Sequence, residues 1–166
     1  AHGYHAGYCT TSGCYNVSMG FAALRGTTTA SNNTAIGTCA LYNNTGGSNT
    51  AVGAVAMQNN TTGEYSIAMG RYALNDNSTG CRNVALGYAA MLSNTTASQN
   101  TAVGSRALYT NTTGIKNDAF GFKALQANTT GCCNTASGSY ALALNTTGCK
   151  NVAIGGSALY TACANN

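Results

Sequence analysis

Apolar and polar positions recur along this chain with a period of 17 residues. Each period holds a short apolar stretch, a glycine, an alanine followed by leucine or methionine, and then a polar Asn-Thr-Thr-Gly stretch. The first glycine recurs ten times, and every step between copies is 17 residues except one step of 16. The missing residue falls in the polar stretch around Asn44, where a loop tolerates deletion. Such a fixed period is the signature of a repeat protein built from stacked units.

The repeat favours β-structure over helix. Every unit contains at least one glycine together with Asn, Thr or both, which interrupt any helical stretch. Two short extended segments fit each unit, as in 151–154 and 157–160, with Gly155 between them and the polar stretch turning the chain back. We therefore predict one all-β domain over residues 1–166, a single parallel β-solenoid of about ten 17-residue coils.

Stacking predicts which residues are buried. One coil cannot bury its Ala, Ile and Leu, whereas coils stacked at about 4.8 Å form a continuous thin core with ladders of like side chains. Small alanines indicate tight space, and the corner glycines indicate a left-handed or closely approached backbone. The predicted core ladder is Ala40, Ala73, Ala107, Ala124, Ala158, Leu41, Leu74, Leu108, Leu125 and Leu159, and the turn glycines are Gly37, Gly70, Gly104, Gly121 and Gly155.

The asparagine of the polar stretch has two interpretations. Stacked at the bend opposite the corner glycine, it would form an amide ladder with hydrogen bonds along the axis. The same residues match the acceptor pattern Asn-x-Ser/Thr for N-glycosylation, which would place a row of sugars along one edge. Both interpretations stay open for Asn60, Asn77, Asn94, Asn111, Asn128 and Asn145, although the ladder explains the spacing without a modifying enzyme.

The stretches 83–87 (Asn-Val-Ala-Leu-Gly) and 151–155 (Asn-Val-Ala-Ile-Gly) resemble the Asn-Ser-Val-Ala-Ile-Gly motif in the heads of YadA-like trimeric autotransporter adhesins. The whole chain is also similar to the Asn-Thr-Ala-Ile-Gly repeats of phage tail fibres. The resemblance implies a left-handed parallel β-roll, which in that family trimerises side by side and contacts host matrix. The unit here is longer, and that family does not carry eight cysteines.

The composition excludes several classes of protein. Only 6% of residues are charged, against roughly 25% in typical soluble domains. No apolar stretch approaches the roughly 18 residues of a membrane-spanning helix. The cations form no run that would follow a phosphate backbone, so we expect no nucleic-acid partner. They are Arg25, Arg71, Arg82, Arg106, Lys116, Lys123 and Lys150.

No catalytic, metal or cofactor site is predicted. The acids Glu64, Asp76 and Asp118 stand at three different places in the repeat, so no carboxylate pair shares one face. His2 and His5 lie close to Cys9 in the sequence, but a frayed end or a subunit contact is a simpler interpretation than a metal centre.

Eight cysteines favour an oxidising compartment, and so an extracellular or cell-surface location. Cys132 and Cys149 both follow the turn glycine in adjacent coils, as Cys14 and Cys81 do elsewhere. Neighbouring coils bring Cα atoms to about 4.8 Å, inside the range for a disulfide, so we predict a Cys132–Cys149 bridge. The alternative is that these cysteines are small apolar residues.

Two surface patterns bear on function. Paired threonines such as Thr61–Thr62 suggest ice binding, although neighbouring threonines point to opposite faces of an extended strand. Aromatic and cationic residues gather just after the corner glycine, and they form either a solvated face or a lateral contact surface. These residues are Tyr4, Phe21, Arg71, Tyr72, Tyr88, Arg106, Phe122, Lys123 and Tyr140.

The first and last coils keep the repeat, and no polar cap is evident at either end. We therefore expect a non-enzymatic extracellular fibre subunit that stacks head to tail, with Cys163 near Cys9 or Cys14 of the next copy. An adhesive role toward matrix or a host surface is a further candidate. The alternatives are a segment of a trimeric surface adhesin or phage tail fibre, and, less favoured, an ice-binding protein.

Overall fold

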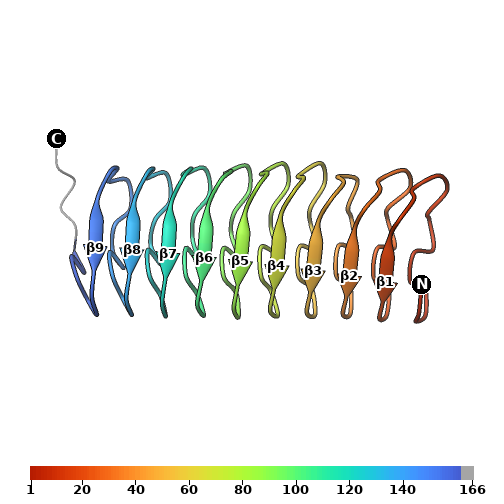
Figure 1. The fold of residues 1–166 in the computed structure, drawn as a ribbon, viewed down its shortest axis with the longest axis horizontal. Coiled ribbons are helices and arrows are strands. Elements are labelled where there is room, and N and C mark those ends of the chain that lie inside the picture. Colours follow the sequence, from red (N-terminus) through yellow and green to blue (C-terminus); the bar gives the residue numbers. More distant parts are fainter. Residues whose placement is uncertain (162–166) are drawn as a thin grey trace.

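The stretch before each corner glycine from Gly20 to Gly155 forms a three-residue β-strand. The computed structural model describes residues 1–161, and these form a rod of stacked coils with one strand in each (Figure 1). The strands are β1 (Val17–Met19), β2 (Thr34–Ile36), β3 (Thr50–Val52), β4 (Ile67–Met69), β5 (Val84–Leu86), β6 (Thr101–Val103), β7 (Asp118–Phe120), β8 (Thr135–Ser137) and β9 (Val152–Ile154).

All nine strands belong to one parallel sheet in the order of the sequence, which confirms the predicted all-β solenoid. Each strand pairs in register with the strand one repeat further on. The short coil keeps this register, since Ala35 pairs with Ala51 across only 16 residues. None of the described residues forms an apolar helix of the length needed to span a bilayer.

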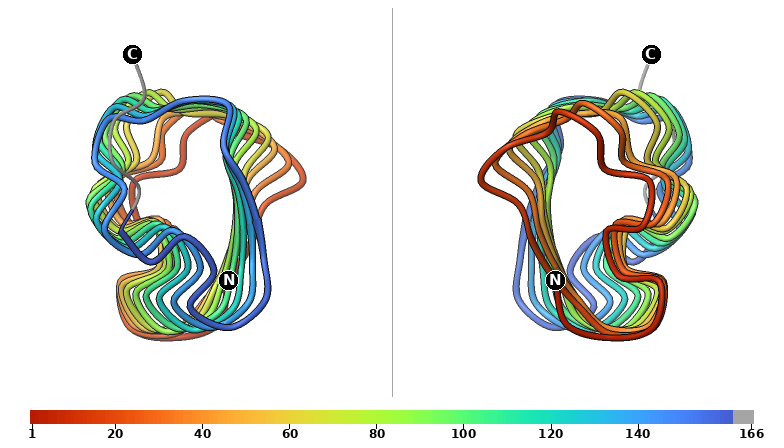
Figure 2. Two further views of the ribbon diagram at one scale, coloured as in Figure 1. Left: turned by 90° about the vertical axis from the view of Figure 1, so that its left-hand side faces the viewer. Right: turned by 90° about the vertical axis from the view of Figure 1, so that its right-hand side faces the viewer.

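The number of coils is smaller than the glycines suggest. Nine strands define eight complete coils between β1 and β9, against about ten predicted. Before β1, His2 forms an isolated parallel bridge with Met19, so the ladder extends one step toward the N-terminus. Figure 2 looks along the rod and shows that successive coils keep one outline while each is slightly offset from the last.

The prediction of a second extended segment after each corner glycine is wrong. The residues after the corner glycine form a turn, because two of them adopt positive φ, as in Tyr72 (62°) and Leu74 (50°). Left-handed backbone costs a non-glycine residue roughly 1–2 kcal/mol. Burial of Leu74 and the hydrogen bond from its N–H to the Ala90 carbonyl of the next coil (2.9 Å) offset this cost.

Within each strand the small residue points inward and the large ones point outward. In β4, Ala68 is fully buried while Ile67 and Met69 are 40% and 45% exposed. Side chains alternate across a strand, so a buried central residue leaves both neighbours on the outer face. The expectation that the Ile of each repeat lies in the core is therefore wrong. Alanine lines this side of the core, with Ser18 in its place in β1.

The opposite side of the core consists of the predicted alanine and leucine ladders. Ala73 and Leu74, like their equivalents in neighbouring coils, have no solvent exposure. Ala158 and Leu159 differ because they lie in the last described coil, where Ala158 is partly buried and Leu159 is 53% exposed. The core is thus a narrow interior of Ala against Ala and Leu, which only stacking can close.

The corner requires glycine for two reasons. Gly53 has φ of +132°, which side-chain-bearing residues rarely adopt, and a Cβ there would lie 2.7 Å from the carbonyl of Gly70. The same pairing of positive φ and close approach recurs along the column. The backbone of each corner therefore packs directly on the next. The sequence predicted either a left-handed or a closely approached backbone at this glycine, and the structure has both positive φ and close approach.

Candidate interaction surfaces

The predicted asparagine row lies inside the rod. Asn77 donates from Nδ2 to Oδ1 of Asn60 in the preceding coil (2.6 Å) and to the carbonyl of Gly80 in its own turn (2.9 Å). Equivalent bonds link the row from Asn44 to Asn145. These side chains are at most 1% exposed, which leaves a glycan no access to them in the folded rod.

A second buried asparagine row was not predicted. It consists of the residue immediately before each strand, as in Asn83 and Asn100, with Ser66 replacing asparagine before β4. Asn83 Oδ1 accepts the backbone N–H of Asn100 (3.0 Å), and Asn100 Nδ2 donates to the carbonyl of Gly114 (2.9 Å). The signal was present in the sequence, because asparagine recurs at this place with the same period.

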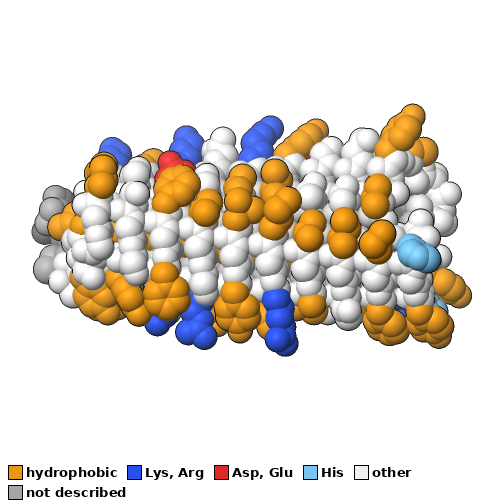
Figure 3. Space-filling view, turned by 60° about the horizontal axis from the view of Figure 1, so that its bottom comes forward, with side chains coloured by type: hydrophobic (Ala, Val, Ile, Leu, Met, Phe, Trp, Pro, Cys, Tyr) orange, Lys and Arg blue, Asp and Glu red, His pale blue; other side chains and the backbone are white. Residues whose placement is uncertain are grey.

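The outer face of the sheet carries a row of apolar side chains. The last residue of every strand except β8 contributes one member, including Met19, Ile36, Met69 and Phe120, and these four are between 37% and 48% exposed. Hydrophobic side chains follow the rod in rows in the space-filling view (Figure 3). We call this the apolar strand row, and Ser137 in β8 interrupts it.

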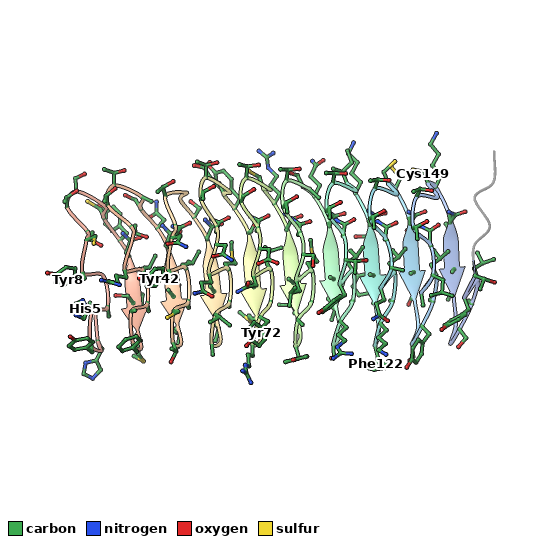
Figure 4. The ribbon with its side chains drawn as sticks, turned by 180° about the vertical axis from the view of Figure 1, so that it is seen from behind. His5, Tyr8, Tyr42, Tyr72, Phe122 and Cys149 are labelled. Carbon is green, nitrogen blue, oxygen red and sulfur yellow. The ribbon has the colours of Figure 1, made fainter. Side chains whose placement is uncertain are left out.

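Aromatic rings and cations form a second surface, along the long edge that follows the corner glycines. We define the aromatic–cation edge as Arg71, Tyr72, Tyr88, Arg106, Phe122, Lys123 and Tyr140. Figure 4 shows Tyr72 and Phe122 on this edge and Cys149 on the opposite one. All of these residues were singled out in the sequence, and the structure places them in successive turns of the same kind.

The cations of this edge rest on aromatic rings. The Arg71 guanidinium lies 4.7 Å from the centre of the Tyr72 ring. Lys123 Nζ lies 5.2 Å from the Phe122 ring and 5.3 Å from the Tyr140 ring. The Phe122 and Tyr140 rings meet edge to face at 5.3 Å. Cation–π contacts of this kind contribute about 0.5–1 kcal/mol at exposed sites and restrict where the charge can point.

The cysteines predicted to be bridged lie side by side without a covalent bond. Sγ of Cys132 and Sγ of Cys149 are 2.9 Å apart, which exceeds the roughly 2.05 Å of a disulfide. The hydrogen bond from the Cys132 thiol to Cys149, with smaller effects of desolvation and of Cys133, raises the pKa of Cys132 to about 11. Cys14 and Cys81 hold the same place in coils without a neighbouring cysteine, and their backbone N–H groups bond to serine side chains instead.

The N-terminal candidates are spread along the first coil. Cys9 and Cys14 are exposed, while Cys163, their predicted partner in the next copy, lies outside the described residues. His5 packs against the ring of Tyr4 at 4.1 Å between ring centres. Among residues 1–161, no three His, Cys, Asp or Glu side chains gather closely enough to hold a metal ion.

The threonine pairs divide between two roles. Thr61 donates from Oγ1 to the carbonyl of Ser78 in the next coil (2.8 Å), whereas Thr62 is exposed in the turn. Thr129 repeats this bond to the Thr146 carbonyl (3.1 Å). The first hydroxyl of such a pair is therefore used in stacking, so the pair does not present two free hydroxyls to water.

The fold and these surfaces define a β-solenoid repeat protein whose coils are closely equivalent. No pocket opens among the described residues. No family model, curated protein or solved structure matches the chain.

Proposed function

We propose that this protein is a passive, non-enzymatic structural rod that stacks head to tail into extracellular filaments. The observation that carries the proposal is the equivalence of the coils. Interior coils offer their neighbours the same backbone ladder and, from Asn44 to Asn145, the same asparagine bonds, as Asn94–Asn77 and Asn128–Asn111 illustrate. A second copy placed on the end coil would find the backbone donors and acceptors that an interior coil finds.

The strand edge of β9 supports this proposal. Within the described residues β9 pairs only with β8, and Ile154 is 76% exposed, well above its equivalents in interior coils. At the other end of the rod the N–H of His2 donates to the Ser18 carbonyl of the following coil (2.8 Å). Ile154 holds the same place in its coil, so its N–H points toward the position that a following coil would occupy. Unpaired strand edges of this kind bind further strands.

Electron microscopy of the purified protein at low micromolar concentration tests stacking. We expect smooth, unbranched fibres with an axial repeat close to the length of one chain. The variant Ile154→Pro removes the edge N–H and should shorten the fibres, whereas Ile154→Ala removes only the side chain and should leave elongation intact. A monodisperse species that never elongates, even after oxidation, would rule the proposal out.

A second candidate is a segment of a trimeric surface adhesin or phage tail fibre, in which lateral contacts replace axial ones. The apolar strand row favours it, because an extended stripe of exposed apolar side chains marks an association surface. Native mass spectrometry separates the candidates. Lateral oligomers should dissociate in the double variant Met69→Ser/Phe120→Ser, which copies the serine found naturally at Ser137.

We further propose that Cys132 and Cys149 become bridged in the oxidising environment of such a filament. Their Sγ separation of 2.9 Å supports this, since only a small side-chain rotation brings them to bonding distance.

The rival proposal of ice binding is tested by thermal hysteresis. A difference of tenths of a degree between the melting and freezing temperatures, at sub-millimolar protein concentration, would favour ice binding over the structural rod.

A further inference from the structure

The aromatic–cation edge has a composition that neither the core nor the strand stacking requires. Arg71 and Arg106 are exposed, and Tyr88 is 46% exposed. These side chains project from turns whose backbone already bonds to the neighbouring coils, as Arg106 N–H does to the Tyr88 carbonyl (2.9 Å). The edge is thus a row of outward side chains on a rigid backbone, suited to binding a partner that follows the rod.

The charge of this edge selects an acidic partner. Its three cations, Arg71, Arg106 and Lys123, have no carboxylate among them, since the acids of the chain occupy other places in the repeat. Glu64 follows a turn glycine, Asp76 precedes a ladder asparagine, and Asp118 begins β7. A second copy of this protein fits this edge poorly, because the same edge of another copy carries the same three cations.

The small number of cations and their wide spacing argue against a densely charged polyanion such as a nucleic acid. Arg106 stands two coils beyond Arg71, and Lys123 one coil further, so the three span about 14 Å at about 4.8 Å per coil. Affinity for single-stranded nucleic acid depends on the number of phosphates that the protein neutralises. The logarithm of the binding constant falls with the logarithm of the salt concentration with a slope of about 0.7 per phosphate. Three contacts therefore give little affinity for a chain that carries one charge on every nucleotide.

Rings outnumber charges on this edge, which favours a partner recognised mainly through ring contacts. The edge holds four aromatic side chains and three cations, and the rings of Tyr72 and Tyr88 meet edge to face at 6.2 Å. A pyranose ring presents a face of C–H groups that packs on an aromatic ring, while its carboxylate pairs with an arginine or lysine. A sugar chain with a charge on only some of its units matches both features.

We propose that the aromatic–cation edge binds a uronate-containing acidic polysaccharide that lies extended along the rod. Its sugar rings pack against exposed rings such as Tyr88, and its carboxylates pair with Arg71, Arg106 and Lys123. This binding rests on the extracellular role proposed above and gives that role a partner of defined chemistry. The coil-to-coil repeat lets the same chain continue from one rod to the next in a filament.

Binding of hyaluronan fragments at low salt, measured by isothermal titration calorimetry, tests the proposal. We expect the double variant Arg71→Ala/Lys123→Ala to weaken binding at least tenfold. The matched control Arg82→Ala/Lys150→Ala removes the same charge from the opposite edge and should change affinity less than twofold. Tyr88→Ala should also weaken binding, whereas Tyr65→Ala, an exposed tyrosine beside Arg82, should not. Circular dichroism of each variant verifies that the fold is kept.

Three outcomes would overturn the proposal. Equal weakening by both double variants would show attraction by net charge alone. Tighter binding of a poly-dT oligonucleotide than of hyaluronan would identify the edge as a nucleic-acid surface. Absence of hyaluronan binding to the unsubstituted protein would also refute it. Electron microscopy of the same samples keeps the two proposals separate, because Arg71→Ala/Lys123→Ala should leave filament length unchanged.

Discussion

Asn77 and Asn60 lie in adjacent coils and share a buried hydrogen bond of 2.6 Å between Nδ2 and Oδ1. Neither side chain has any exposure to solvent. Each asparagine between the two ends of the row therefore acts as donor to the coil before it and as acceptor for the coil after it, while its second N–H closes its own turn. This double use makes the row both a turn-forming element and an axial connection.

Replacing one interior member of the row should destabilise the rod. Asn77→Ala leaves Asn60 Oδ1 and the Gly80 carbonyl without their donor, while Asn94 Nδ2 loses its axial acceptor and keeps only the Ala97 carbonyl. We expect a loss of about 2 kcal/mol or more. Thermal unfolding followed by circular dichroism measures it. The exposed Asn59→Ala is the control and should stay within about 0.5 kcal/mol. Equal melting temperatures for the two variants would contradict a stabilising ladder.

Adding a side chain at a corner glycine should destabilise the fold more than adding one at a glycine outside the stack. Gly53→Ala forces a Cβ to 2.7 Å from the Gly70 carbonyl at a φ of +132°, and we expect a loss of about 3 kcal/mol or more. Gly156→Ala meets no atom within 4 Å and has no positive φ, so it should be nearly neutral. Denaturant unfolding of both proteins provides the comparison. A stable Gly53→Ala protein would show that the corner can relax.

Oxidation should link two adjacent coils through a disulfide. Incubation with glutathione disulfide should join Cys132 to Cys149, with release of two glutathione thiols for each bond formed. The bridge connects residues 17 apart and should add about 3 kcal/mol through loss of unfolded-chain entropy. Peptide mass spectrometry without reduction identifies the pair, and Cys133→Ser is the control that should keep it. Finding both residues as free thiols, or each paired elsewhere, would refute the bridge.

Thiol reactivity should report the hydrogen bond that holds the Cys132 proton. Its pKa is raised to about 11, so the thiolate is scarce at neutral pH and alkylation should accelerate only as the pH approaches that value. Cys149→Ala removes the main cause of the shift and should move the alkylation profile to lower pH. Site-resolved mass spectrometry with iodoacetamide measures the profile, and Cys81→Ala should not alter it. Identical profiles in all three proteins would exclude the coupling.

The sequence predicted the period, the parallel in-register stacking, the corner glycine and the inward Ala73 and Leu74 columns. These features are accessible because each is a local property repeated along the chain, and translation by one repeat is the simplest way to bury so few apolar residues per coil. The asparagine row with Asn77 was predictable on the same ground, since identical polar residues one coil apart find partners in each other.

The functional surfaces were harder to predict. The sequence singled out Arg71, Tyr72 and Lys123, but whether they formed a solvated face or a contact surface was undecided. Stacking of the turns places them on one edge and puts the cations on the rings. The proximity of Cys132 and Cys149 was predictable from the period alone, whereas the thiol hydrogen bond between them depends on side-chain rotamers that a repeat pattern does not specify.

By itself the sequence determined that the chain forms a stack of coils, because the repeat fixes which residues recur one above another. Only the tertiary structure decided which side of each strand faces inward and how the segment after Gly70 is shaped. Ala68 is inside and Met69 outside because the opposing Ala and Leu columns leave room for a methyl group and no more. The left-handed turn at Tyr72 and Leu74 follows from the same restriction, since only a sharp bend brings the leucine back over so narrow a core.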